Sequence, residues 1–216
     1  MNRFELTDEQ WDKIKGLLPP ETGRKGHPSK DNRLILNGIL WILRTGAPWR
    51  DLPERYGPWG TVYTRFSRWT KQGIWANVFE QISTDSDDES KMLDSTVIRA
   101  HQHAAGAIGG QGNQALGRSS GGFSTKIHAV VDALGYPVEI ELSAGQVHDS
   151  VPAKDLLTDQ KAEYVIADKA YDCNDLIELI ESQGSEAVIP SRRNRKEQRD
   201  YDKHIYKERH LVEIFF

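Results

Sequence analysis

The sequence is short of cysteine and of long apolar stretches. Cys173 is the single cysteine among 216 residues, so no disulfide can form within the chain, and a reducing, cytoplasmic setting fits best. No apolar run approaches the length that a membrane-spanning helix needs, and the first ten residues, "MNRFELTDEQ", lack the apolar core of a signal peptide. We therefore expect a cytoplasmic globular protein with no membrane partner.

Charge is unevenly distributed along the chain. The whole sequence has 28 Lys and Arg against 32 Asp and Glu, a net charge of −4, which argues weakly against a nucleic-acid partner. Residues 1–75 nevertheless carry 13 basic residues against 8 acidic ones, residues 76–91 carry 1 against 5, and residues 92–216 carry 14 against 19. This asymmetry is expected of a DNA-reading module joined to a second domain, although a chance excess on a solvated surface would give the same counts.

The first 83 residues predict a helical domain. Thr7 and Gln10 have the spacing of a capping box at the start of the first helix. Asp31 is the expected N-cap of a second helix, which is apolar over most of its circumference, Leu43 included, and should be buried. The acidic segment 84–90 contains no apolar residue and is interpreted as a linker.

A third helix, within "PWGTVYTRFSRWTKQG", predicts a helix-turn-helix-like unit with a basic outer face. Its apolar stripe consists of Val62, Phe66 and Trp69. Arg65, Arg68 and Lys71 are the candidate DNA contacts of this unit. A small three-helix unit can have the same pattern without touching DNA.

After residue 90 the apolar periodicity changes from helical to alternating. We expect strands at "KMLDSTVIRA", "EYVIADKAYD" and "EAVIPS", and an antiparallel hairpin of "FSTKIHAVVDA" with "PVEIELSAG". Helices are expected at "SVPAKDLL", at "CNDLIELIESQG" and at the end of the chain. The segment "HQHAAGAIGGQGNQALGRSSGG" should be a loop or a mobile arm. This order of elements indicates a mixed α/β sheet.

Two aspartates lie in or at the end of apolar strands. Asp94 is inside "MLDSTV" and Asp168 ends "YVIAD". A carboxylate among buried apolar residues is costly unless it is paired, and a metal ion is one possible partner. Taken singly, each aspartate is better explained as a turn residue or a helix cap.

A third acid changes this interpretation. Tyr206, Arg209 and Glu213 are spaced i, i+3, i+7 and should share one face of the final helix. The residues around Glu213 are apolar nearly all round, so we expect this helix to be buried and to press Glu213 against the sheet. Three carboxylates suit Mg²⁺ or Mn²⁺, and a pair of such ions is the usual machinery of phosphodiester chemistry.

At this point the sequence resembles the DDE transposases of bacterial insertion sequences, in the IS-five group of the IS-four-like superfamily. The similar blocks are "LTDEQWDKIKGLLP", "GAPWRDLPERYGPW", "LDSTVIRAHQHAAGA", "GRSSGGFSTKIHAVVDALG", "VIADKAYD" and "YKERHLVE". They span nearly the whole chain in the family's order and spacing. Tyr206, Arg209 and Glu213 match the family's third-acid signature, whose Lys would fall beyond residue 216.

The resemblance implies an RNase H-like mixed sheet flanked by helices, two Mg²⁺ ions that Mn²⁺ can replace, and DNA strand cleavage and transfer. It implies that Asp94, Asp168 and Glu213 are the catalytic metal ligands, with Tyr206 and Arg209 in support. It also implies that the partner is double-stranded DNA, at the element's terminal repeats and the target, and that the protein acts as a homo-oligomer on DNA.

The remaining polar residues carry weaker hypotheses. The histidines have no compact ligand spacing and no cysteine partners, so we expect no zinc site. Asp149 precedes a helix and is expected to cap it, and Lys169 reaches either a phosphate or solvent. A basic loop close to the third acid offers further candidate contacts to the DNA backbone: Arg192, Arg193, Arg195 and Lys196.

The sequence thus predicts a helical DNA-binding domain over residues 1–83, a linker over 84–90 and an RNase H-like catalytic domain over 91–216. Two other hypotheses remain open: a metal-dependent nuclease on the same fold that cuts without joining, and a truncated remnant that binds the element's ends and represses. Because the chain stops on Phe215 and Phe216, soon after Glu213, we expect it to be C-terminally incomplete, with weak or no activity.

Overall fold

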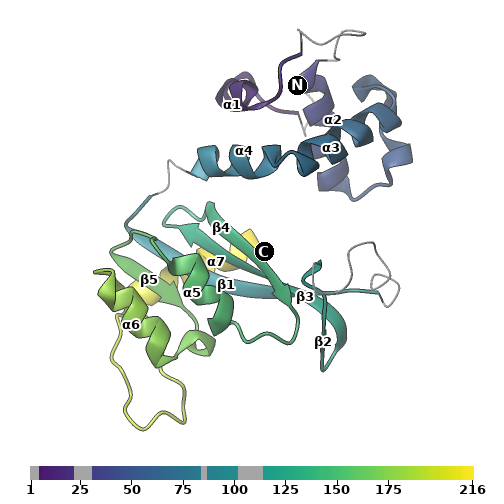
Figure 1. Cartoon of the computed structure of the whole chain (residues 1–216). Coiled ribbons are helices and arrows are strands. Elements are labelled where there is room, and N and C mark those ends of the chain that lie inside the picture. Colours follow the sequence, from purple (N-terminus) through teal and green to yellow (C-terminus); the bar gives the residue numbers. More distant parts are fainter. Residues whose placement is uncertain (1–4, 22–30, 84–86, 102–113) are drawn as a thin grey trace. The chain divides into compact units, whose positions relative to one another are not determined.

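The computed structural model describes residues 5–21, 31–83, 87–101 and 114–216. The chain divides into two compact units, Met1–Ile82 and Ser83–Phe216 (Figure 1). Each unit is described by itself below. None of the helices in these ranges is both long and apolar enough to cross a membrane.

The first unit is helical. Its elements are α1 (Asp8–Ile14), the 3₁₀ turn η1 (Lys15–Leu17), α2 (Asn32–Thr45), η2 (Trp49–Asp51), η3 (Glu54–Tyr56), α3 (Trp59–Lys71) and α4 (Ile74–Ser83). The expected caps are confirmed. Thr7 and Gln10 form a complete capping box at α1. The Asp31 carboxylate accepts from two backbone N–H groups at the start of α2, and Gly46 ends that helix in the left-handed region that glycine favours.

The apolar core of the first unit lies between α2 and α3. Ile35 and Ile39 of α2 are fully buried against Val62 and Trp69 of α3. The expectation that α2 is buried all round is wrong, because the Leu43 side chain is 62% exposed. α2 packs against α1, α3 and the 3₁₀ turns, but part of its surface around Leu43 stays open to solvent.

The second unit is built on one mixed sheet. Its strands are β1 (Ser90–Arg99), β2 (Gly117–Ser119), β3 (Gly122–Asp132), β4 (Pro137–Ala144), β5 (Tyr164–Ala167) and β6 (Glu186–Val188). The strand order is β2-β3-β1-β5-β6, and β4 also pairs with β3. β3 is antiparallel to β1, β2 and β4, whereas β1, β5 and β6 run parallel. The β3–β4 hairpin is confirmed, as is the mixed α/β class, and this arrangement of strands is that of an RNase H-like sheet.

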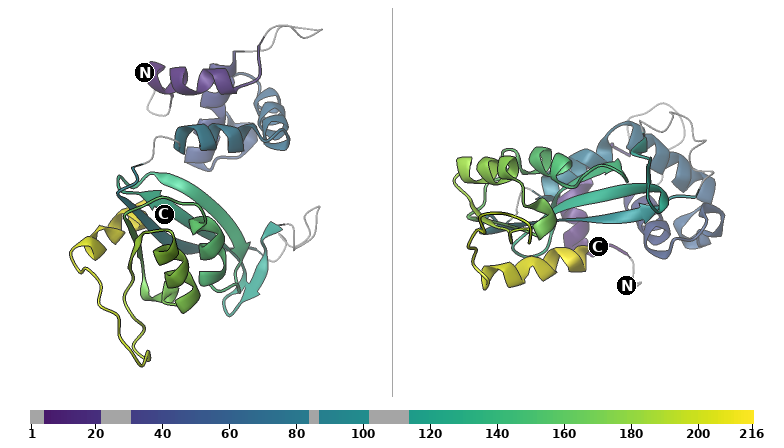
Figure 2. Two further views of the ribbon diagram at one scale, coloured as in Figure 1. Left: turned by 60° about the vertical axis from the view of Figure 1, so that its left-hand side comes forward. Right: turned by 90° about the horizontal axis from the view of Figure 1, so that it is seen from below.

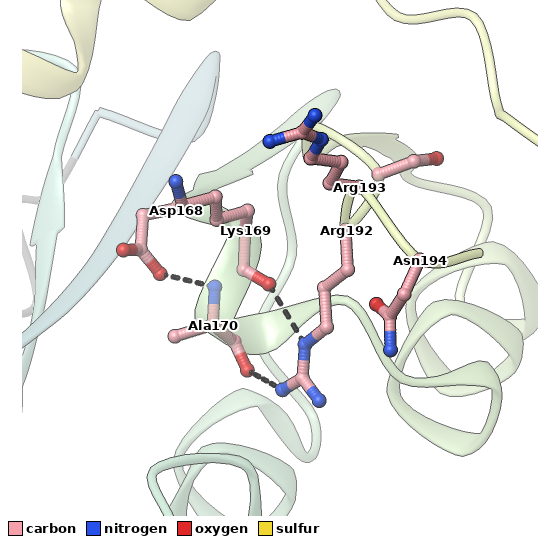
Figure 3. A pocket seen from close by; sticks show the side chains of 7 residues that line it. Asp168, Lys169, Ala170, Arg192, Arg193 and Asn194 are labelled. Carbon is pink, nitrogen blue, oxygen red and sulfur yellow. Dashed lines mark hydrogen bonds between the residues drawn. The ribbon is translucent and has the colours of Figure 1, made fainter.

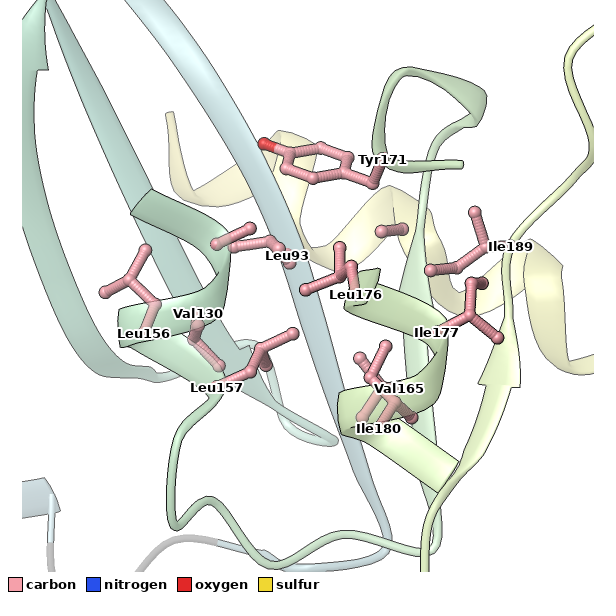
Figure 4. Packing of buried hydrophobic residues seen from close by; sticks show 12 residues of the cluster. Leu93, Val130, Leu156, Leu157, Val165, Tyr171, Leu176, Ile177, Ile180 and Ile189 are labelled. Carbon is pink, nitrogen blue, oxygen red and sulfur yellow. The ribbon is translucent and has the colours of Figure 1, made fainter. Parts of the chain in front are cut away.

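Helices cover both faces of this sheet, as the view from below shows (Figure 2). On one face lie α5 (Ser150–Leu157) and α6 (Asn174–Ser182). On the other lie the 3₁₀ segment η7 (Ile205–Arg209) and α7 (His210–Phe215). Alternation along β1 serves both faces: Leu93 packs in the cluster with α5 and α6 (Figure 4), and Met92 packs in the cluster that contains Val212 of α7.

Three details of the second unit differ from the sequence-based expectation. Residues 117–119 of the Gly-rich segment form strand β2, while residues 102–113 of the same segment lie outside the described residues. The final helix is not buried all round: Val212 is buried, but Ile214 is 74% exposed and Phe216 is 43% exposed. α7 therefore contacts the sheet along one stripe only.

The third difference concerns the expected linker. Its residues 84–86 lie outside the described part, but residues 87–90 are attached to the second unit. Ser90 already belongs to β1, and the buried Lys91 ammonium donates to the carbonyl of Asp87 (2.9 Å) and to the carboxylate of Asp88 (3.0 Å). The Asp88 carboxylate therefore balances the charge of a buried lysine, which composition alone could not show.

Candidate active site

Two of the three expected acids lie at the same level of the parallel pair β1 and β5, Asp94 within β1 and Asp168 directly after β5. Leu93 of β1 is paired with Ala167 of β5, so the residues that follow them, Asp94 and Asp168, stand at the same level of the sheet. Asp94 Oδ1 accepts from the N–H of Ser95 (2.8 Å). Asp168 Oδ1 accepts from the N–H of Ala170 (2.7 Å) at the start of the 3₁₀ turn η6 (Lys169–Tyr171), which fixes its direction (Figure 3).

The third acid reaches this pair through an arginine. Arg209, at the end of η7, donates from Nη1 to Asp94 Oδ2 (3.1 Å) and from Nη2 to Glu213 Oε1. The Arg209 side chain is 22% exposed, the Asp94 side chain 21%, and the Glu213 side chain 52%. Arg209 and Glu213 are one helical turn apart, so the spacing that the sequence shows does bring them together on one face.

The neighbouring charges also change the pKa of Asp94. Burial raises the pKa of Asp94, and the nearby negative charges of Asp168 and Glu213 raise it further. The N–H of Ser95 and the Arg209 guanidinium act in the opposite sense and lower the pKa. Asp168 and Glu213 thus lie near enough to Asp94 to act on its pKa.

The donor chemistry of this site fits a hard divalent ion, but the acids do not yet form a finished coordination shell. Over the residues that the structure describes, no three His, Cys, Asp or Glu side chains lie close enough to hold a metal ion together. The Arg209 guanidinium instead supplies the positive charge between Asp94 and Glu213. Carboxylate oxygens are the ligands that Mg²⁺ and Mn²⁺ prefer, so the residue types suit the ion that the resemblance implies.

Tyr206 supports the arginine. Its ring packs edge-on against Tyr201, with centroids 5.4 Å apart, and the Arg209 guanidinium carbon lies 6.0 Å from the Tyr206 ring centroid. Burial raises the pKa of the Tyr206 hydroxyl, so it stays protonated at neutral pH. Tyr206 thereby limits the directions in which Arg209 can point.

The basic loop after β6 separates into two kinds of residue. Arg192 and Arg195 are half-buried and their side chains are bonded within the protein: Arg192 Nε donates to the carbonyl of Lys169 (3.1 Å), and Arg195 Nε donates to both carboxylate oxygens of Asp172 (3.0 Å each). Arg193 and Lys196 are exposed. The expectation that all four contact DNA is therefore best kept for the exposed pair, since the other two side chains already have partners.

The candidate DNA contacts of the first unit divide in the same way. Arg65 donates from Nη1 to Asn32 Oδ1 (2.7 Å) and its guanidinium carbon lies 5.5 Å from the Trp69 ring centroid. Arg68 and Lys71 are exposed. Contact with DNA stays a prediction for all three, and the structure gives Arg65 a second task inside the helical unit.

One sequence-based assignment close to the site, Asp149 as a helix cap, is confirmed in position but not in its bonding. Asp149 precedes α5, but its side chain makes no capping hydrogen bond. Its Oδ1 accepts from Lys126 Nζ (2.9 Å) and from Ser95 Oγ (3.1 Å), directly behind Asp94. Neither Asp149 nor the arginine-bound Asp172 could be paired from the sequence, since both partners come from distant segments.

Comparison with known proteins agrees with this geometry. The model of the transposase DDE domain family matches residues 86–215, and a model described as candidate transposases of the IS4/5 family matches residues 6–79. A fold with paired acids on adjacent strands and two such matches defines a protein of the DNA transposase class. The chain belongs to the DDE transposase family of IS4/5 insertion sequences, and the resemblance stated from its motifs is confirmed.

Individual relatives are short proteins from bacteria. An uncharacterised protein, y4sN, of Sinorhizobium fredii is 43% identical over 109 residues, which are 50% of this chain and 87% of the relative. An uncharacterised protein of insertion element IS402 from Burkholderia cepacia is 36% identical over 44% of this chain and 73% of the relative. A candidate transposase for insertion sequence element IS6501 of Brucella ovis is 41% identical over 44% of this chain and 74% of the relative.

Solved structures give more distant likenesses. A piggyBac transposase synaptic complex with hairpin DNA is 13% identical, with a TM-score of 0.48 over 86% of this chain and 48% of that one. The Mos1 transposase paired-end complex is 12% identical, with a TM-score of 0.28 over 78% of this chain and 61% of that one. The chain thus spans about half of the piggyBac chain and about three fifths of the Mos1 chain.

Proposed function

We propose that this chain binds the ends of an insertion sequence and catalyses divalent-metal-dependent cleavage and joining of DNA strands. The observation that carries the proposal is the placement of Asp94 and Asp168 at one level of two parallel strands, with Glu213 tied to Asp94 through Arg209. The family supports the same reaction class.

Asp94, Asp168 and Glu213 are the residues that would hold the ions. When bound, ions of the Mg²⁺ type supply the charge that activates an attacking hydroxyl and stabilises a leaving 3′-oxygen. The chain's own contribution is position. The strand register fixes Asp94, the bond from Ala170 fixes Asp168, and the helical turn from Arg209 to Glu213 sets the third carboxylate.

Arg209 has a separate role in this proposal. In the structure it neutralises part of the charge of Asp94 and Glu213, which reduces the repulsion between these two carboxylates. Because a guanidinium also binds phosphate oxygens well, Arg209 can turn from the acids to a DNA phosphate when cations occupy the acids.

DNA is the proposed partner of both units. In the helical unit the exposed Arg68 and Lys71 on α3 are available to backbone phosphates. We propose that the chain acts on double-stranded element ends as a homo-oligomer, because joining needs two ends in one complex.

The function is tested with Asp94→Asn and Asp168→Asn in the full chain. The substrate is a labelled duplex with the element's terminal repeat, incubated with Mg²⁺ or Mn²⁺. An amide keeps the shape of the carboxylate but loses the charge that binds a metal ion, so we expect cleavage to fall at least about 100-fold while DNA affinity stays within about threefold.

The matched control is Asp159→Asn. Asp159 is exposed and has φ 63°, a conformation that Asn tolerates equally well, so activity should not change. Cleavage at the wild-type rate in both site variants would contradict the three-acid site. Metal-dependent cutting without strand joining would instead identify the chain as a nuclease.

A further inference from the structure

An open pocket of about 580 Å³ lies beside Asp168, on the side away from Asp94's strand. Residues from two segments line it: Asp168 and Lys169 follow β5, and Ser191, Arg193 and Asn194 follow β6 (Figure 3). The pocket therefore adjoins the proposed reaction centre without containing all three of its acids.

One wall of the pocket is held in place by Arg192. Its Nε donates to the carbonyl of Lys169 (3.1 Å) and its Nη2 to the carbonyl of Ala170 (2.5 Å). These bonds join the loop after β6 to the turn that carries Asp168. Because Nε and Nη2 of Arg192 both donate to backbone carbonyls, and Nη2 also lies 3.4 Å from His148 Nε2, we assign this arginine a role in shaping the pocket.

The buried Asp172 carboxylate anchors the same loop after β6 through two arginines. The Asp172 side chain is 2% exposed and pairs with Arg195 (2.9 Å) and Arg199 (3.1 Å). Both arginines also donate to Asn174 Oδ1. Two guanidinium groups on one carboxylate leave an excess of one positive charge, so this anchor favours an anion in its neighbourhood.

Two cations of the pocket remain available. Lys169 and Arg193 are exposed, and within the described part of the chain neither side chain has a hydrogen-bond or ion-pair partner. Figure 3 shows Arg193 extending away from Arg192, which reaches toward the carbonyl groups. The loop thus presents Arg193 at the pocket while the anchored arginines keep the loop in shape.

We propose that this pocket binds a backbone phosphate of the DNA strand that is cut, next to the phosphate that faces Asp94 and Asp168. Lys169 and Arg193 supply the charge, and the Asn194 amide is a further donor. The inference rests on the proposed function and adds a positioning site to it. Lys169 and Arg193 hold one phosphate of the strand, and the neighbouring phosphate then lies against Asp94 and Asp168. This arrangement aligns the strand for in-line attack.

The first test measures DNA affinity against salt concentration for the full chain, without divalent metal. The variants are Lys169→Ala and Arg193→Ala, and the probe is the terminal-repeat duplex. We expect affinity to fall about tenfold for Arg193→Ala, and the slope of log affinity against log salt to become shallower by about 0.9 when both cations are removed. Arg193→Lys, which keeps the charge, should retain the slope.

The matched control is Lys161→Ala. Lys161 is an exposed lysine just before β5, at the end of that strand opposite to Asp168, so its loss should leave affinity and slope unchanged. Because Lys169 and Arg193 are exposed, the variants should keep the wild-type circular dichroism spectrum. Arg193→Gln replaces Arg193→Ala if the latter does not fold.

The second measurement uses duplexes with one neutral methylphosphonate, moved along the strand. One position should weaken binding of the wild-type chain but not of the double variant Lys169→Ala/Arg193→Ala. Free inorganic phosphate at constant ionic strength should not compete, because the site takes a phosphate held in a strand. Competition would assign the pocket to a small phosphate ligand and overturn the inference.

The outcomes separate the two proposals. If the wild-type chain cuts DNA and the double variant has the same slope of log affinity against log salt as the wild type, the phosphate pocket is wrong and the proposed function stands. If the wild-type chain does not cut DNA, but the double variant has a shallower salt slope and no longer responds to the methylphosphonate, the pocket is supported and the proposed function is contradicted.

Discussion

Two clusters of acid and arginine lie at neighbouring points of the second unit, and their proportions are reversed. Around Arg209, one guanidinium serves two carboxylates, those of Asp94 and Glu213. Around Asp172, one carboxylate serves two guanidinium groups, those of Arg195 and Arg199. The first cluster has an excess of negative charge and the second an excess of positive charge.

The difference shows how the same residue types can serve binding or stability. In the first cluster Glu213 is 52% exposed, and under the proposed function a metal ion would take the place of Arg209 beside the acids. In the second cluster Asp172 is 2% exposed and bonded on both oxygens, so it has nothing to exchange. An incompletely paired cluster is available to a ligand, whereas a fully paired one holds two segments together.

The largest expected effect comes from Asp172→Asn. The change leaves Arg195 and Arg199 facing each other with no negative charge between them. Losing one partner of a buried ion pair costs about 3–5 kcal/mol, and because the arginines are 21% and 31% exposed we expect about 2–4 kcal/mol in the free energy of unfolding.

Urea unfolding at an unchanged m-value measures this loss. Asp175→Asn is the control, since Asp175 forms an exposed pair with Lys154 and should contribute little. A loss below about 1 kcal/mol for Asp172→Asn would remove the distinction between the two clusters.

Asp94→Asn should behave in the opposite way. Burial raises the pKa of Asp94, so its ionised form is disfavoured in the folded state, and stability falls as the pH rises through that raised pKa. A neutral amide removes this cost but also loses the bond from Arg209. We expect no loss of stability, and a net gain if the removed burial cost exceeds the lost bond, at neutral pH without metal, measured by the same unfolding experiment. A loss as large as that of Asp172→Asn would show that both clusters are structural.

The smallest expected effect on stability comes from His128, a buried titratable group. Unlike the two clusters above, His128 is bonded to no arginine in the described residues. Its side chain is fully buried, with Nε2 2.7 Å from Ser143 Oγ and Nδ1 4.0 Å from Asp149 Oδ1. Burial lowers the pKa of His128 and Lys126 lowers it further, while Asp149 raises it. The unfolded chain therefore binds the proton first, and stability is lost as the pH falls below the unfolded value of about 6.5.

The measurement is the melting temperature between about pH 7 and pH 5, compared in wild type and His128→Gln. We expect the variant to lose less stability over this interval, because Gln cannot take up the proton. An identical pH dependence in the two proteins would assign the acid sensitivity to other groups.

The sequence predicted the elements well where a local signal exists. The Thr7 and Asp31 caps, Gly46 and the β3–β4 hairpin follow from neighbouring residues and are present in the structure. The short strand β2 was missed because Gly117 and Ser119 give no alternating pattern. Burial was overestimated at Leu43 and Ile214, since an apolar residue does not show whether a neighbour covers it.

The candidate site was predictable in part for the same reason. Asp94, Asp168 and Glu213 stand out because a charge in an apolar segment is unusual, and the resemblance drawn from the sequence motifs implies the same three residues. The partners of Asp149 and Asp172 were not predictable, because each bond joins segments brought together only by folding. Roles in metal and DNA binding stay predictions.

Two core residues of β1, Met92 and Leu93, hold the strand in the register against β5 that places Asp94 beside Asp168. Met92 faces the α7 side and Leu93 faces the α5 and α6 side, and this order alone decides which way Asp94 points. A slip of one residue would bury Asp94 among the side chains around α5 and bring Ser95 to the site. A polar substitution at either core position should therefore abolish the proposed activity, although every acid and every DNA contact is unchanged. Inactive copies of the family are then to be recognised from their strands as well as from their motifs.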